Sequence, residues 1–437
     1  MKICLISPKV TASLQRSMPM TPYGLQLVAA ATPPEHEVEI IDEGVGQEAD
    51  FDKQFDLVGM SVTTAQAPRA IELAKEFKKR GAQVIMGGFH PTLVPDQVPE
   101  CFDAICVGEG EGIWPDIVSD AEKGQLEGIY RSEEFIDLAQ LPKPRRDLSP
   151  MDKYRFSDLV FASRGCPFKC NFCSVNQFYD FTYRTRPVED VVEEVRRVKE
   201  NRRRPRMPWD FVFFMDDNIV GSPEYAKKLF RALIPLKIRW FSQASITIAD
   251  DPELLSLAQQ SGCAGLAVGF ESVCEESLKG VNKHMIGTLK KYRENITKIH
   301  AHKIFILGLF MFGLDNDDKN IFDQALKFCE ENHVEVMTMA ILTPFPGTAM
   351  GAKMVEEGRI LTDDLTLYNQ GHVVFQPKLM TPDELQWGYR DVARKSTAAW
   401  SVFKRLLGAR TSWILPIGWN IITRRASVRL PKDTSYL

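Results

Sequence analysis

Short apolar segments alternate with helical ones along most of this chain. In the first part, the apolar segments predict strands at Lys2–Leu5, Glu37–Ile41, Leu57–Ser61, Gln83–Met86 and Ala104–Val107. The stretch from Ala67 to Arg80 predicts a helix, because it is followed by Gly81 in the position of a helix C-cap. Strands that alternate with helices are typical of a doubly wound parallel sheet, whose ligand lies beyond the strand carboxyl ends. The chain is therefore predicted to begin with an α/β domain.

A second series of strands and helices follows a polar segment that contains several prolines. Its predicted strands are Leu159–Ala162, Phe211–Met215, Trp240–Ala244, Leu266–Phe270, Ile304–Phe310 and Val336–Leu342. Six such units predict a partial (β/α)6 barrel, in which functional groups gather at the strand carboxyl ends. The predicted division is a first domain at 1–135, a linker at 136–155, the barrel at 156–350 and a helical segment at 351–437.

The charge balance and the cysteine content narrow the class of protein. The chain has 54 Lys and Arg against 58 Asp and Glu, a net charge of -4, so no global basic field is available to bind nucleic acid. Nine cysteines in 437 residues do not suggest a disulfide framework, and the first residues do not form an apolar signal segment. We expect a reducing, cytoplasmic location and no membrane-spanning helix.

Three predicted strands of the first domain end in small or polar residues. Thr63 follows one strand, the pair Gly87 and Gly88 with His90 follows the next, and Gly108 with Glu109 follows the third. Glycine allows the backbone to approach a flat or anionic ligand closely, but it also makes tight strand-to-helix turns, and both interpretations remain open. The first strand is not followed by G-x-G-x-x-G, which argues against a nicotinamide dinucleotide.

Three cysteines lie close together after the first predicted barrel strand. Cys166, Cys170 and Cys173 have the spacing C-x3-C-x2-C, and Arg164 and Lys169 beside them favour thiolates. Structural zinc usually needs a fourth ligand from a second Cys or His pair, which does not follow at a useful spacing. An iron-sulfur cube held by three thiolates leaves one iron open to a small molecule. The triad therefore predicts a cluster at which chemistry takes place.

The triad, with Phe172 before its third cysteine, resembles the radical S-adenosylmethionine enzymes. Strand-end segments at 215–218, 243–245, 269–272, 308–313 and 342–348 are similar to that family's successive motifs. The resemblance implies a 4Fe-4S cluster, cleavage of S-adenosylmethionine to a 5'-deoxyadenosyl radical, and an electron donor such as flavodoxin or ferredoxin. The residues that it implies beside S-adenosylmethionine are Phe172, Asp216, Gln243, Glu271, Phe310 and Leu342.

Within that family, the first domain resembles a Rossmann-like cobalamin-binding domain. The implied cobalamin contacts are Thr63, Gly87, Gly88, His90, Gly108 and Glu109. The D-x-H-x-x-G signature of many cobalamin proteins is absent from the sequence. The domain therefore either binds cobalamin without a histidine ligand from that motif or binds nothing. His90 is either a cobalt ligand or a turn histidine that bonds to the backbone.

The resemblance also implies a reaction. The segment from 374 to 390 is similar to that of members that act on hopanoids and related lipids. The leading hypothesis is methyl transfer to an unactivated carbon of a hydrophobic lipid, polycyclic or natural-product substrate, through methylcobalamin. One alternative is a radical cyclase, oxidase or rearrangement enzyme without methyl transfer. Another is a cobalamin or iron-sulfur sensor without turnover.

The C-terminal segment is basic and aromatic. Residues 401 to 437 contain seven Lys or Arg against one Asp, interleaved with Trp413 and Trp419. Such a segment can lie at a membrane interface, which would make the protein peripheral to the inner membrane. Alternatively, it is a terminal helix that packs its tryptophans on the barrel. The sequence leaves both interpretations open.

Overall fold

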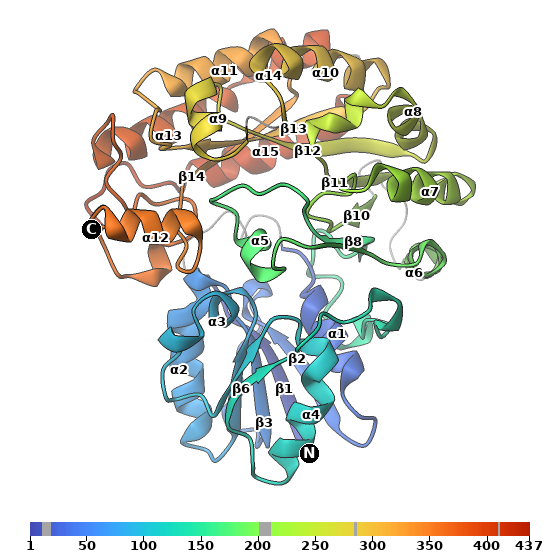
Figure 1. Ribbon diagram of the computed structural model, residues 1–437, viewed down its shortest axis with the longest axis vertical. Coiled ribbons are helices and arrows are strands. Elements are labelled where there is room, and N and C mark those ends of the chain that lie inside the picture. The colour runs from blue at the N-terminus through green and yellow to red at the C-terminus, as the bar shows by residue number, and fades with distance from the viewer. Residues whose placement is uncertain (11–18, 201–210, 284–285, 410) are drawn as a thin grey trace. The chain divides into compact units, whose positions relative to one another are not determined.

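The computed structural model describes residues 1–10, 19–200, 211–283, 286–409 and 411–437, and these form two compact units (Figure 1). The first unit contains 1–157 together with the short segments 344–352 and 363–369. The second contains 158–343, 353–362 and 370–437. Each unit is built on its own six-stranded parallel sheet.

The sheet of the first unit has the strand order β2-β1-β3-β4-β5-β6. Its strands are β1 (Lys2–Ser7), β2 (Glu37–Asp42), β3 (Leu57–Ser61), β4 (Gln83–Gly87), β5 (Ala104–Val107) and β6 (Gly128–Arg131). The first five agree with the predicted strands to within two residues. β6 was not predicted, because its residues are largely exposed at the sheet edge and lack an apolar pattern.

Helices cover both faces of this sheet (Figure 1). They are α1 (Tyr23–Ala31), α2 (Ala67–Lys78), α3 (Phe89–Leu93) and α4 (Gly110–Glu122). Leu73 and Phe77 of α2 belong to the core on one face, whereas Leu25 of α1 and Ile117 of α4 belong to the core on the other. Burying a side chain of this size contributes about 1.5–3 kcal/mol. After β2 is added on one side of β1, the following strands are added on the other side, beginning with β3. Ligands of doubly wound sheets bind at the strand carboxyl ends beside such a switch point.

The sheet of the second unit follows the chain order β7-β10-β11-β12-β13-β14. Its strands are β7 (Leu159–Val160), β10 (Val212–Phe214), β11 (Trp240–Gln243), β12 (Cys263–Glu271), β13 (Phe305–Phe312) and β14 (Val336–Ile341). Sequential parallel neighbours are the arrangement of a β/α barrel, and here β7 and β14 are the two edges. The predicted α/β class, with a doubly wound sheet and then a partial barrel, is confirmed.

One face of the second sheet is covered by the helices that connect its strands. Those between the strands are α6 (Val188–Glu200), α7 (Pro223–Leu233), α8 (Pro252–Gln260), α10 (Leu289–Ala301) and α11 (Ile321–Glu331). Trp240 lies 5.0 Å from Phe230 of α7, and Phe270 lies 5.6 Å from Phe328 of α11, measured between ring centroids. Shorter helices are α5 (Ser174–Phe178) and α9 (Glu275–Gly280). Trp240 and Phe270 thus point to the face of the sheet that the helices cover.

The C-terminal helix packs on the opposite face of the same sheet. The last helices are α12 (Ala349–Glu356), α13 (Pro382–Ser396), α14 (Ala399–Gly408) and α15 (Ile414–Ser427). Phe241 and Phe305 stack at 5.6 Å across Gly265, where a Cβ would meet the Phe305 ring at 2.3 Å. Trp419 of α15 stacks on Phe241 at 5.7 Å. This tryptophan therefore packs on the barrel, as the second interpretation of the C-terminal segment predicts.

A buried polar network anchors α14 and α15 to the start of β14. Arg405, which is fully buried, donates hydrogen bonds to the carbonyl oxygens of Val334, Glu335 and Ser396 and to Asn420 Oδ1. The Glu335 carboxylate accepts bonds from the Ile306 amide at 2.9 Å, from the Thr411 hydroxyl at 2.6 Å and at 3.2 Å from His300 when that ring carries its proton on Nε2. Buried charges persist where such partners surround them.

None of the helices described is long and apolar enough to cross a bilayer.

Candidate functional site

A cavity of about 240 Å³ lies at the carboxyl ends of the strands of the second unit. The loop after β8 (Ser163–Gly165) and the first turn of α5 form one wall, and the ends of β10 to β13 form the other. The lining residues are Cys166, Phe168, Cys170, Phe172, Cys173, Val175, Asn176, Asp217, Asn218, Gln243, Ala244, Ser245, Ala267, Gly269, Glu271, Lys283, Ile286 and Leu309. The cavity thus brings the cysteine triad to the place where a β/α barrel gathers its functional groups.

Local hydrogen bonds hold the cysteine loop in place. β8 pairs antiparallel with β9 (Tyr183–Thr185), which closes the loop at its base. Asn176, almost fully buried, donates to the carbonyl oxygens of Phe168 at 2.8 Å and Cys170 at 3.3 Å. Gly165 has φ +83°, and a Cβ there would lie 2.0 Å from the Thr182 carbonyl oxygen. Only glycine can therefore occupy this turn.

The cysteine thiols fit an iron-sulfur cluster by their chemistry. All three are free, and burial raises the pKa of each, to about 12 for Cys173. Thiols of this kind ionise when they bind a metal. Among the described residues, no three His, Cys, Asp or Glu side chains converge as a single metal ion would require. A cube does not need that convergence, since each thiolate binds a different iron.

An ion pair lies in the cavity beside the triad. Lys283 Nζ donates to Glu271 Oε1 at 2.9 Å, and both side chains are largely buried. Burial alone would lower the pKa of Lys283, but the Glu271 carboxylate holds it above the ordinary value. Glu271 has φ +63° and follows a register shift between β12 and β13, and this geometry turns it into the cavity. A cation and a carboxylate side by side are complementary to a zwitterionic amino acid such as the methionine part of S-adenosylmethionine.

The lining contains part of the sequence-predicted set. Cys166, Cys170, Cys173, Phe172, Gln243 and Glu271 line the cavity, whereas Asp216, Phe310 and Leu342 do not. Asp216 is fully buried and accepts hydrogen bonds from the Ala162 amide and the Ser163 hydroxyl, so it fixes the turn between β7 and β8. Phe310 stacks on Phe270 at 5.5 Å, on the helix-covered face. Leu342 is buried just after β14, where its amide donates to the Phe312 carbonyl.

The structure also adds residues that sequence reasoning missed. Asp217 lines the cavity in place of its neighbour Asp216, and burial raises its pKa to about 7. Leu309 lines it in place of Phe310. Asn218 reaches Cys166 Sγ at 3.9 Å and accepts the Ser245 amide at 3.0 Å. Lys283 lies in a loop without a strand pattern, so no sequence signal pointed to it.

The strand ends of the first unit contain glycine and one buried histidine. At Gly108, φ is +86° and no heavy atom lies within 4 Å of a Cβ position. His90 is buried, its amide donates to the Val62 carbonyl oxygen at 2.9 Å, and burial lowers its pKa to about 4. Its Nδ1 has no partner among the described groups. Glycine at these strand ends allows a large flat ligand such as cobalamin to approach the backbone closely.

The other predicted residues of this edge have structural contacts. Thr63 forms a capping box with Gln66, whose side chain accepts the Thr63 amide at 2.8 Å. Gly87 ends β4, and Glu109 is buried at the start of α4. The Thr92 hydroxyl donates to the Gly88 carbonyl at 2.7 Å and accepts the Gly108 amide at 2.9 Å. The last bond ties two of the predicted strand ends together.

Gly88 and Gly108 allow a matched prediction about this edge. At Gly88, φ is +98° and a Cβ would lie 2.7 Å from Val62 N and 2.9 Å from Val62 O, which are backbone atoms that cannot move aside. Gly88→Ala should therefore lower the free energy of unfolding by about 2–4 kcal/mol. Gly108→Ala should lower it by only about 1–2 kcal/mol, because its positive φ is unfavourable for alanine but its Cβ meets no other atom. Denaturant unfolding measures both. Equal costs would contradict the packing described.

The comparisons with known proteins agree with both units. Residues 160–329 match the family model of the radical SAM superfamily, and residues 12–118 match that of the B12 binding domain. An uncharacterized methyltransferase of Synechocystis sp. is 30% identical, over 83% of this chain and 68% of its own. The bacteriochlorophyllide d C-12(1)-methyltransferase of Chlorobaculum tepidum is 29% identical, over 97% of this chain and 94% of its own.

A solved structure shares the whole fold. The radical S-adenosylmethionine methyltransferase TsrM of Kitasatospora setae superposes with a TM-score of 0.71 at 16% identity, over 97% of this chain and 99% of that one. The two domain matches and the full-length relatives confirm the resemblance that the cysteine spacing and the glycine-rich strand ends implied. The chain therefore belongs to the radical S-adenosylmethionine superfamily, within the cobalamin-dependent methyltransferase family that joins this domain to a B12-binding domain.

Proposed function

We propose that this chain transfers a methyl group to an unactivated carbon of a hydrophobic small molecule. The observation that carries the proposal is one cavity with three free cysteines and the Lys283–Glu271 pair, in a chain that also has a B12-binding domain. Of the relatives described, the Chlorobaculum tepidum enzyme is named for methyl transfer to C-12(1) of bacteriochlorophyllide d. An unactivated carbon has no group that an acid, a base or a nucleophile of the protein can activate. The protein must therefore act by positioning the substrate and by excluding water.

The proposed assignments follow the lining of the cavity. Cys166, Cys170 and Cys173 would hold the 4Fe-4S cluster, and the strand ends with Gly88 and Gly108 would hold cobalamin. The cluster with S-adenosylmethionine supplies the radical, and cobalamin carries the methyl group. Further residues proposed for S-adenosylmethionine are Phe172, Asp217, Gln243, Glu271, Lys283 and Leu309.

The residues of this chain have distinct parts in that arrangement. Lys283 and Glu271 would bind and orient the charged groups of the amino acid moiety, because they are fixed and largely buried. Phe172, Ile286 and Leu309 are apolar residues of the lining and would keep water from the reacting centre. Gly269 makes room for the ion pair, since a Cβ there would lie 2.3 Å from Glu271 Oε1 and 3.0 Å from Lys283 Nζ.

Removing the buried cation should weaken S-adenosylmethionine binding. Lys283→Met removes the cation proposed to bind the carboxylate of the methionine moiety, which should cost about 2–4 kcal/mol, or roughly 30- to 1000-fold in Kd. Gly269→Ala should give a smaller loss of about tenfold, because it displaces the pair without removing it. Equilibrium dialysis of the reconstituted protein measures both. Lys279→Met is the control, since Lys279 is exposed on α9, pairs with Glu276 at 3.7 Å and does not line the cavity. An unchanged Kd in Lys283→Met would contradict the assignment.

Deuterium-labelled S-adenosylmethionine tests the reaction itself. Reconstituted protein, supplied with a reductant, cobalamin and an apolar cell extract, should form 5'-deoxyadenosine and S-adenosylhomocysteine together. One extract compound should gain a labelled methyl group. Formation of 5'-deoxyadenosine alone, with no label transferred, would favour cyclisation, oxidation or rearrangement. Complete failure to cleave S-adenosylmethionine would favour a sensor.

The radical step also requires an electron from outside the chain. We propose a small reducing carrier, of the flavodoxin or ferredoxin type, in the cytoplasm. A reducing compartment agrees with the nine cysteines, all of which are free in the structure.

A further inference from the structure

Two successive C-terminal helices expose apolar side chains at helical spacing. Trp400, Phe403 and Leu407 repeat at intervals of three and four residues on α14, and Trp400 is 66% exposed. Ile414, Ile417 and Ile421 do the same on α15, and Ile414 is 54% exposed. The opposite side of α15 is buried through Leu415, Trp419 and Ile422. Both helices therefore have an apolar side that is exposed among the residues that the structure describes.

These helices lie at the amino ends of the barrel strands. Arg405 and Asn420 both bond to the backbone of Glu335, the residue directly before β14. The cysteine triad and Lys283 lie at the carboxyl ends of the strands, the other end of the same sheet. A partner that covers the exposed sides of α14 and α15 would thus leave the radical site open.

The C-terminal segment that carries the exposed apolar side chains is itself almost entirely basic. Arg424, Arg425, Arg429 and Lys432 are all exposed, and from 399 to 437 the sequence contains a single acidic residue, Asp433. Trp400 and Phe403 stack at 5.7 Å, with Lys404 Nζ 5.9 Å from the Trp400 ring. Cations combined with tryptophan and aliphatic side chains are typical of surfaces that lie in a membrane interface.

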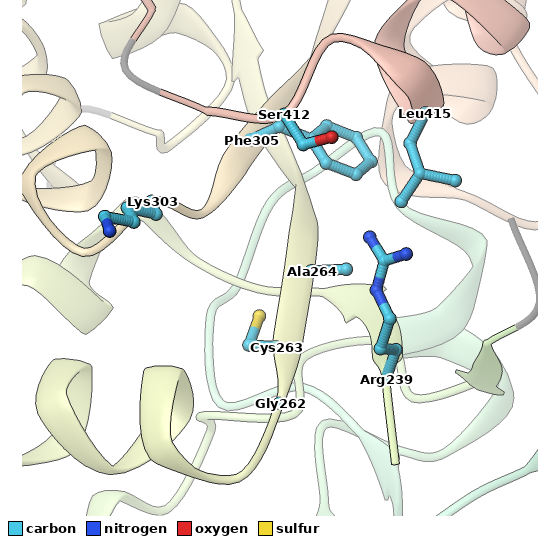
Figure 2. A pocket seen from close by; sticks show the side chains of 8 residues that line it. All are labelled: Arg239, Gly262, Cys263, Ala264, Lys303, Phe305, Ser412 and Leu415. Carbon is cyan, nitrogen blue, oxygen red and sulfur yellow. The ribbon is translucent and has the colours of Figure 1, made fainter. Parts of the chain in front are cut away.

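A second cavity opens beside the first turn of α15 (Figure 2). It measures about 240 Å³ and is lined by Arg239, Lys303, Ser412 and Leu415, among others, and none of the described residues that line it is acidic. The Arg239 guanidinium extends toward Leu415 in Figure 2. Trp413 and Ile414, which stand between Ser412 and Leu415 in the chain, are exposed. The cavity therefore places cations next to the exposed apolar side chains.

We propose that the exposed sides of α14 and α15, with this cavity, dock the protein on the surface of an anionic lipid bilayer. Trp413, Ile414 and Ile417 enter the interface, and the exposed arginines together with the cavity cations face the lipid phosphates. A second copy of this chain is a poorer occupant, because a symmetric contact would bring Arg424, Arg425 and Arg429 against themselves. A bilayer supplies negative charge along the whole surface.

Co-sedimentation of the full chain with vesicles tests this proposal. Binding is expected to phosphatidylcholine vesicles that contain phosphatidylglycerol, to fall as salt is added, and to be weak for phosphatidylcholine alone. The pair Arg425→Glu and Arg429→Glu should weaken binding at least about tenfold. The pair Ile417→Ser and Ile421→Ser should weaken it similarly while leaving the thermal melt unchanged, because both side chains are exposed.

Matched controls make the test specific. Lys290→Glu with Arg293→Glu reverses two exposed charges on α10, and Val355→Ser with Ile129→Ser removes exposed apolar side chains elsewhere. Neither control should change vesicle binding. Absence of binding to anionic vesicles, or equal binding by the test and control variants, would overturn the proposal. Concentration-dependent dimers that the isoleucine variants abolish, without vesicle binding, would assign the surface to a second copy instead.

Discussion

Replacing Cys170 by alanine is expected to remove both bound iron and cleavage of S-adenosylmethionine. Cys170 lines the cavity between the other two cysteines of the loop, and its loss leaves two thiolates for a cube that needs three. Iron analysis, the visible absorbance of the reconstituted protein and 5'-deoxyadenosine formation should all fall to background. The Cys170→Ala protein should fold, because the loop is held by Asn176 and by the β8–β9 pair rather than by the thiol.

Cys101→Ala provides the control for this experiment. Cys101 is a free, partly buried cysteine of the first unit and lies outside the cavity lining. The control protein should retain its iron and its activity. Iron retained at full occupancy in Cys170→Ala, or lost equally from the control, would show that the triad does not hold the cluster.

Replacing Arg405 by methionine is expected to destabilise the second unit by about 3–5 kcal/mol. Methionine fills much of the volume but leaves the carbonyl oxygens of Val334 and Glu335, and Asn420 Oδ1, without their buried donor. The thermal midpoint should fall by roughly 10 °C. Because the lost bonds join α14 and α15 to the start of β14, both helices should also become sensitive to proteolysis.

Lys404→Met is the matched control, one residue away on the same helix. Its ammonium group is exposed and pairs with Glu330 at 3.0 Å, a surface contact worth less than about 1 kcal/mol. A similar loss of stability in both variants would show that the network does not anchor the C-terminal helices.

The strands were predictable from sequence because each buried segment is a short apolar run. Ten of the eleven predicted strands agree with the structure within two residues at both ends. The eleventh, β12, extends three residues earlier, to Cys263, through a part of the strand that contains Gly265. β6 and the β8–β9 pair were missed since they lie at an edge or in a loop and carry no apolar pattern.

Which side chains line the cavity was harder to predict. Successive residues of a strand point to opposite faces, so an error of one position moves a side chain out of the site. Leu309 faces the cavity and Phe310 the helices, although both lie in the same apolar run. At the end of β10, Asp217 and not Asp216 lines the cavity. The order of the family motifs was enough to find these strand ends in the sequence. Which residue of each strand end points into the cavity depends on the alternation of side chains along the strand.

Charge pairing between distant segments was not predictable at all. Lys283 and Glu271 are 12 residues apart, and Arg405 lies 70 residues from Glu335. Neither Lys283 nor Arg405 stands in a pattern that distinguishes it from an exposed charge, and only tertiary packing brings each to its partner. The resemblance supplied Glu271 because the family motif contains it, and the cation beside it came only from the structure.

Electron paramagnetic resonance of the anaerobic, reduced protein shows whether the cysteine triad holds a cluster with an open iron. We expect the signal of one reduced 4Fe-4S cluster per chain, which changes when S-adenosylmethionine is added because the open iron then gains a ligand. Zinc or no metal at the triad, or a cluster signal that S-adenosylmethionine leaves unchanged, would contradict the assignment of the triad to a radical S-adenosylmethionine centre.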